Sequence, residues 1–162
     1  MICKKIESCG KKYNHPKKTL IDFKGGKSSF RIENNSNLTY NIIDFENHVY
    51  QNREEDTKCD YGLETDSTIY FIELKGNDLE KGCNQLRATI NETKKCFKNK
   101  NIKARLVVSK VKKPKLFRNT SNYKQLVKAV GSAENIVVGS QVLKQIIYKK
   151  LTPLLILLEN ET

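Results

Sequence analysis

The stretch that decides the fold of this chain is KCDYGLETDSTIYFIELKGNDLEKGCNQLRAT, residues 58–89. It holds two apolar runs, CDYGL and TIYFIELKG, separated by the turn residues ETDS. Aromatic and β-branched residues favour strands, so the two runs predict strands that pair as a hairpin. Both runs also carry charged residues, namely Asp60, Glu73 and Lys75. Charges are costly to bury, so their presence in these strands needs a reason.

A helix is expected directly after the second strand. Asn77 is the predicted cap, with Glu80 three residues later in the position of a capping box. The apolar residues recur at helical spacing and form one face: Leu79, Cys83, Leu86, Ile90 and Phe97.

The rest of the chain predicts further strands and helices. Strands are expected in NLTYNIIDFENHVYQN (37–52), IKARLVVSKV (102–111), ENIVVGS (134–140) and a hairpin over TLIDFKGGKSSFRIE (19–33). Helices are expected in SNYKQLVKAVGS (121–132), closed by Gly131, and in QVLKQIIYKKLTPLLILLEN (141–160), interrupted at Pro153. This order predicts an α/β fold with a mixed central sheet flanked by helices.

The chain length of 162 residues suits one compact domain. Residues 1–18 are rich in lysine and lack periodicity, so we expect a flexible basic arm or a short helix there, and a single domain over 19–162. No apolar run reaches the roughly 20 residues that cross a bilayer. The first ten residues, MICKKIESCG, have no apolar core for a signal peptide. We therefore expect a cytoplasmic protein with no membrane partner.

Five cysteines at irregular spacing predict reduced thiols, because a disulfide framework favours an even number in a shorter secreted chain. A zinc site made of Cys3, Cys9 and His15 is a weaker alternative, since the spacing matches no common zinc pattern.

The net charge of +12 is unevenly placed along the chain. Residues 1–40 carry a net charge of +6 and residues 81–150 a net charge of +16, whereas residues 41–80 carry −8. The basic parts fit a polyanion such as nucleic acid. The acidic part would repel that partner unless a divalent cation lies on it. A general lysine-rich surface bias is the alternative explanation of the basic charge.

The charged residues of the two strands form a constellation with a chemical use. Side chains alternate along a strand, so Glu73 and Lys75 share one face, and Asp60 can approach Glu73 across the hairpin. Two carboxylates at a strand edge can bind Mg²⁺, which polarises a phosphate and lowers the pKa of a bound water. A neighbouring lysine can orient that water or neutralise developing charge. A surface Glu73–Lys75 ion pair with an unrelated Asp60 is the non-functional alternative.

Asp60, twelve intervening residues, and then Glu73-Leu74-Lys75 resemble the motif of the PD-(D/E)XK nuclease superfamily. The resemblance implies a restriction endonuclease-like core and an Mg²⁺ ion, for which Mn²⁺ can substitute. It implies that Asp60, Glu73 and the Leu74 carbonyl are metal ligands and that Lys75 is the catalytic lysine. Gln85 corresponds to a glutamine that several members carry near the site. Many members also have an upstream acidic residue, for which Glu33 and Glu46 are the candidates by position.

These features predict an Mg²⁺-dependent deoxyribonuclease, most simply an endonuclease, with RNA as the alternative substrate. Cutting both strands of a duplex would need two symmetry-related sites, and so a homodimer. A basic loop is expected to contact phosphates through Lys110, Lys112, Lys113, Lys115 and Arg118. The competing hypotheses are a non-catalytic nucleic-acid-binding protein on a degenerate nuclease fold, and a protein-interaction or toxin-neutralising protein without nucleic-acid affinity.

Overall fold

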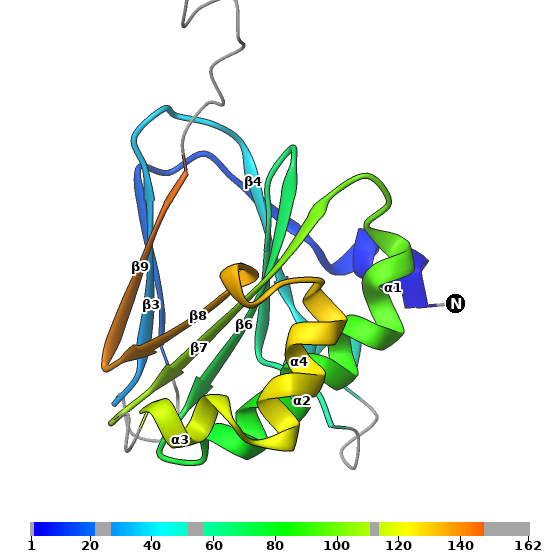
Figure 1. Ribbon diagram of the computed structural model, residues 1–162. Coiled ribbons are helices and arrows are strands. Elements are labelled where there is room, and N and C mark those ends of the chain that lie inside the picture. Colours follow the sequence, from blue (N-terminus) through cyan, green and yellow to red (C-terminus); the bar gives the residue numbers. More distant parts are fainter. Residues whose placement is uncertain (1, 22–26, 52–56, 111–113, 148–162) are drawn as a thin grey trace, which may run out of the picture.

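The structure of the protein is a computed structural model that describes residues 2–21, 27–51, 57–110 and 114–147. Its elements form three layers: helices, a six-stranded sheet, and a three-stranded sheet (Figure 1). One apolar core lies between the helices and the large sheet, and a second core lies between the two sheets. The prediction of an α/β fold with a mixed central sheet and packed helices is therefore confirmed, but the helices cover one face of that sheet and the small sheet covers the other.

The large sheet has the strand order β1-β4-β5-β6-β7-β8. These strands are β1 (Lys11–Tyr13), β4 (Tyr40–Asp44), β5 (Tyr61–Glu64), β6 (Thr68–Lys75), β7 (Asn101–Val108) and β8 (Ile136–Ser140). β5 and β6 pair antiparallel, as the hairpin prediction required, whereas β6, β7 and β8 run parallel. The carboxyl ends of these three parallel strands therefore meet at one edge of the molecule.

The small sheet contains β2 (Lys17–Ile21), β3 (Ser29–Asn34) and β9 (Val142–Ile147). The predicted hairpin over residues 19–33 is present, because β2 and β3 pair antiparallel. The helix expected over residues 141–160 is wrong where the structure describes the chain, since β9 is a strand parallel to β3. Exposed and covered residues alternate along β9, which is the period of a strand and not of a helix. The remainder of that predicted helix lies outside the described residues.

Four α-helices lie in the described residues: α1 (Ile2–Cys9), α2 (Leu79–Thr93), α3 (Pro114–Arg118) and α4 (Ser121–Val130). α2 begins one residue later than expected, because the cap is Asp78, whose side chain accepts a hydrogen bond from Lys81 N, and not Asn77. α4 ends as predicted at Gly131, whose φ of 86° favours glycine. Three short helical segments complete the described chain: η1 (Phe45–Val49), η2 (Lys94–Cys96) and η3 (Ala133–Asn135). None of the described helices is long and apolar enough to cross a membrane.

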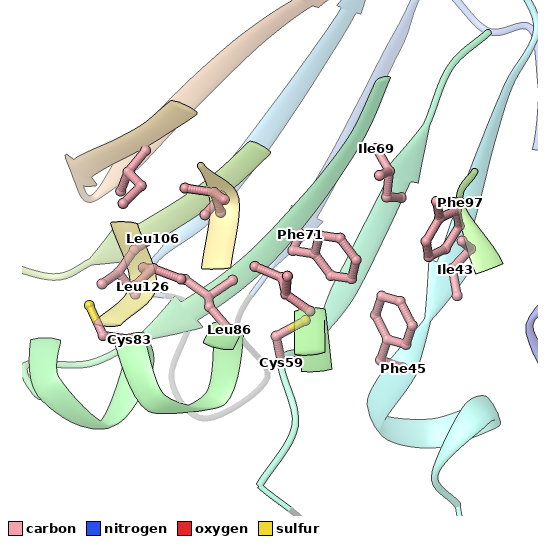
Figure 2. Close-up of a cluster of buried hydrophobic side chains, with 14 of the residues drawn as sticks. Ile43, Phe45, Cys59, Ile69, Phe71, Cys83, Leu86, Phe97, Leu106 and Leu126 are labelled. Carbon is pink, nitrogen blue, oxygen red and sulfur yellow. The ribbon is translucent and has the colours of Figure 1, made fainter. Parts of the chain in front are cut away.

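Aromatic rings and aliphatic side chains fill the core beneath the helices (Figure 2). Phe71 on β6 stacks on Phe45 with ring centroids 5.6 Å apart and meets Phe97 edge-on at 5.8 Å. Leu86 of α2 and Leu126 of α4 gather beside Leu106 of β7 in the same view. This packing presses α2 onto β6 and β7, the strands that carry and flank the charged residues.

The N-terminal residues include the short helix expected as the alternative to a flexible arm. α1 buries Ile6 in the helix-side core, and β1 pairs antiparallel with β4, so this segment belongs to the folded domain. The prediction of reduced thiols is wrong for two of the five cysteines, since Cys3 and Cys96 form a disulfide that joins α1 to η2. Their pairing arises because the amphipathic α1 packs next to η2 in the fold, a proximity that local sequence does not contain.

Candidate active site

Glu73 lies near the carboxyl end of β6, on the face of the sheet that α2 covers. Its side chain is 0% exposed. Gly82 lets α2 lie close over the sheet at this point: a β-carbon at Gly82 would lie 2.6 Å from Leu106 Cδ1, a clash, and 3.6 Å from Glu73 Cγ, an ordinary van der Waals contact. The sequence interpretation missed Gly82. The available signal was a glycine inside a helical pattern, which often marks close packing.

Asp60 lies immediately before β5, in the position that the hairpin pairing predicts. Its Oδ2 accepts a 2.7 Å hydrogen bond from Leu74 N, and its backbone carbonyl accepts a 2.9 Å bond from Phe45 N. The first bond joins Asp60 to the strand that carries Glu73, one residue away from it. The structure therefore brings Asp60 and Glu73 together.

Lys75 also joins this group. Its Nζ lies 3.3 Å from Glu73 Oε1, which is within ion-pair distance, and its side chain is 21% exposed. Neither carboxylate oxygen of Glu73 makes a well-formed hydrogen bond among the described residues, although Lys75 and the backbone of Asp60 lie close enough to favour its charged form. Glu73 therefore has one nearby cation and two buried oxygens without a well-formed hydrogen bond.

The surroundings of Glu73 favour its neutral form in the metal-free protein. Burial raises its pKa well above the usual value, and the negative charge of Asp60 raises it further. The charge of Lys75 acts in the opposite direction and is the weaker influence. A cation placed between the two carboxylates would reverse this balance by favouring their charged forms.

Gln85 takes a supporting position on α2. Its Nε2 donates a 2.8 Å hydrogen bond to the Lys58 carbonyl, and its buried Oε1 has no hydrogen-bond partner among the described residues. One turn later, Thr89 Oγ1 accepts a 2.8 Å bond from Cys59 N. Both contacts hold the segment that precedes Asp60. This arrangement gives Gln85 and Thr89 a role in positioning Asp60, and the sequence interpretation missed Thr89.

The two candidates for an upstream acidic residue lie in different places. Glu33 is paired with Lys144 at 2.7 Å on the small sheet, where the bond to Lys144 lowers its pKa. Glu46 is exposed on η1, and its backbone N–H approaches the Asp60 carbonyl at 3.4 Å. Of the two, Glu46 is therefore the neighbour of the Asp60 segment.

The basic loop is only partly described. Lys110 and Arg118 are exposed, and Lys110 follows Ser109, whose N–H donates a 2.7 Å bond to the Gly76 carbonyl. Lys110 is thereby held at the carboxyl end of β7, beside the end of β6. Lys112 and Lys113 lie outside the described residues, and for Lys115 the description covers the backbone in α3 but not the side chain.

Whether these residues fit a metal ion can be tested on Glu73 itself. No group of three or more His, Cys, Asp or Glu side chains with metal-binding placement occurs within the described ranges. Two adjacent carboxylates nevertheless supply oxygen ligands, and the oxygens of Glu73 make no well-formed hydrogen bond to the part of the chain that the structure describes. Mg²⁺ often binds through one or two carboxylates and keeps several waters. The donor set of Asp60 and Glu73 thus fits a hard divalent cation.

The zinc alternative does not fit the fold. Cys3 is bonded to Cys96, so it has no thiolate for a metal, and Cys9 is a separate free cysteine.

The chain matches no family model, no curated protein and no solved structure, so its site is interpreted from the geometry described above.

Proposed function

We propose that the protein is a metal-dependent nuclease that hydrolyses phosphodiester bonds, most simply a DNA endonuclease that uses Mg²⁺. One observation carries the proposal: Glu73 is fully buried beside Asp60 and Lys75, and neither of its oxygens makes a well-formed hydrogen bond among the described residues. An unsatisfied buried polar group costs about 1–3 kcal/mol, and more when it is charged. A residue with a purely structural role would not need a carboxylate there, whereas a metal ligand would.

Each residue of the group has a place in such a reaction. Asp60 and Glu73 would hold the cation, together with the Leu74 carbonyl. The bound cation supplies a Lewis acid for the phosphate and a more acidic water. Lys75, half-buried and 3.3 Å from Glu73, is placed to orient the attacking water or to offset negative charge on the phosphate.

The arrangement of the elements supports the same proposal. The hairpin β5–β6, the covering helix α2 and the parallel strands β7 and β8 have the order expected for a restriction endonuclease-like core. In open α/β sheets, ligands bind beyond the carboxyl ends of the strands, and Lys75 is the last residue of β6. We propose that these elements form that core and that a DNA strand approaches its carboxyl edge.

A plasmid assay tests the proposal directly. Supercoiled DNA should be nicked or linearised in Mg²⁺ or Mn²⁺ and left intact in chelator. Glu73→Gln and Asp60→Asn should both be inactive, whereas Glu134→Gln, at an exposed residue of η3, should cleave as the wild type does. Wild-type protein that leaves DNA and RNA intact with either cation would refute the proposal.

The complete burial of Glu73 also favours a second candidate, a nucleic-acid-binding protein on a nuclease-like fold without catalysis. In this case Glu73 stays neutral and Lys75 contacts a phosphate. Divalent cations would then neither stabilise the protein nor change its affinity for DNA. A cation-dependent rise in the unfolding midpoint, lost in Glu73→Gln, would exclude this second candidate.

A further inference from the structure

We propose that a cavity on the small-sheet side of Lys75 is a subsite for a second phosphate of the bound DNA strand, next to the one that is cleaved. This inference rests on the proposed function. The cavity has a volume of about 430 Å³ and is lined by Lys27, Ser29, Ser109, Gln141 and Val142. These residues come from three separate chain segments, and no carboxylate is among them.

The cavity is held next to Lys75 by backbone contacts. Lys75 pairs with Val108, which pairs with Ser140, so Ser109 and Gln141 are the first residues beyond two strand ends. The buried Ser28 donates a 2.8 Å bond from Oγ to the Lys75 carbonyl, which places its neighbour Lys27 at the end of β6. Lys27, which carries the positive charge of the cavity, and Lys75, the predicted catalytic lysine, therefore lie on adjoining backbone segments.

The groups that line the cavity suit a phosphate. Lys27 is exposed and supplies a positive charge, and Gln141 supplies an amide donor. Ser109 Oγ donates its hydroxyl proton to the Gly76 carbonyl at 2.6 Å and also lies 2.5 Å from Asn77 Oδ1, so this hydroxyl is satisfied within the protein, and Lys27 and Gln141 are the donors for a phosphate. Phosphates are commonly bound by lysine and amide groups of this kind.

Gln141 is held in an unusual conformation at the rim. Its φ is 60°, in the left-handed region that favours glycine. Its backbone N–H donates to the Val108 carbonyl at 2.7 Å, and its own carbonyl accepts from Ser29 N at 2.8 Å. A glycine would adopt this φ at lower conformational cost, but it would lack the side-chain amide that Gln141 places at the cavity.

A second cavity at the same edge of the sheet shows why the DNA strand should bind on the small-sheet side. That cavity, of about 510 Å³, lies toward the helices and is lined in part by Asp78 and Glu80. Asp78 accepts a hydrogen bond from Lys81 N, and Glu80 accepts one from Asn122 Nδ2. Both carboxylates still line the cavity. Phosphate is repelled by this helix-side cavity and attracted by the small-sheet cavity, so the DNA backbone should run over Lys27.

The test is a titration of ¹⁵N-labelled full-length protein with a short DNA duplex in Ca²⁺, chosen so that binding occurs without cleavage. The expected result is chemical-shift change at the amides of Lys27, Ser109 and Gln141, including the Gln141 side chain. Lys27→Ala should weaken binding several-fold and reduce the salt-dependence slope by about one. Lys128→Ala removes the same charge from the exposed face of α4 and should change neither slope nor affinity by a comparable amount.

A further variant separates binding from folding. Gln141→Gly should keep or raise the midpoint of urea unfolding, because it relieves the left-handed conformation, and should still weaken DNA binding. Shift changes confined to the helix-side cavity, or no shift change at all, would overturn the subsite. If the duplex changes the chemical shifts of residues in the small-sheet cavity but the wild type fails to cleave DNA in Mg²⁺, the subsite stands and the nuclease proposal fails.

Discussion

Glu73→Gln should separate the cost of the carboxylate from its use. In the metal-free protein, burial and the charge of Asp60 raise the pKa of Glu73 well above its ordinary value. At a pH between the unfolded and folded pKa values, Glu73 is deprotonated in the unfolded chain and takes up a proton when the protein folds. As far as it depends on Glu73, the free energy of unfolding of the wild type is highest below the unfolded pKa, near 4.5. It falls as the pH rises toward the folded pKa. The glutamine variant, which does not titrate, should not follow this fall.

The size of the effect follows from the proton linkage. Between the unfolded and folded pKa values one proton separates the two states, so the wild type should lose about 1.4 kcal/mol per pH unit relative to the variant. Urea unfolding in chelator, from pH 4.5 upward, measures this difference. Saturating Mg²⁺ or Ca²⁺ should restore the wild type alone, by about 2.7 kcal/mol when the free cation is 100 times its dissociation constant.

The outcome has a clear contrary result and a matched control. Glu134→Gln changes the same functional group at an exposed position and is the control for the loss of a carboxyl group. If the stability difference between Glu73→Gln and wild type does not change with pH, the Glu73 carboxylate ionises as freely in the native state as in the unfolded chain. The reasoning from its burial would then be refuted.

Three further predictions concern the residues around Glu73 and the disulfide. Asp60→Asn should bind DNA in chelator at least as tightly as wild type and remain inactive in Mg²⁺, as fluorescence anisotropy and plasmid cleavage would show; weaker binding by the folded variant would contradict this. Gly82→Ala should lower the unfolding free energy by about 1–3 kcal/mol, because the new β-carbon meets the buried Leu106, and a stability gain in urea unfolding would contradict the packing described. Reduction of the Cys3–Cys96 disulfide, which spans 93 residues, should cost up to about 5 kcal/mol in the same assay, whereas Cys3→Ser should be insensitive to reductant.

Local pattern was sufficient for the elements that carry the candidate site. The alternation in TIYFIELKG and the turn before it predict β6 and its antiparallel partner β5, and both are present. The helical spacing of Cys83, Leu86 and Ile90 predicts the buried face of α2. From these elements follows the approach of Asp60 to Glu73, because a hairpin register and an alternating strand are short-range properties.

Long-range pairing decided the parts that local pattern missed. Val142, Ile146 and Ile147 fit a helix by hydrophobicity, yet this segment becomes β9 because β3, more than a hundred residues earlier, offers an open edge. The ordering of α1 and its disulfide to Cys96 likewise depend on a distant surface. Secondary structure propensity is a weak influence that such tertiary contacts override.

The same distinction applies to Glu73. Its residue type, its strand and its neighbours Asp60 and Lys75 are contained in residues 58–75 of the sequence. Its complete burial is not, because that depends on α2 lying close over β6, which Gly82 permits and Leu106 limits. Alternation along a strand says which face a side chain takes, but the depth of that face is set by whichever element the rest of the chain packs on it.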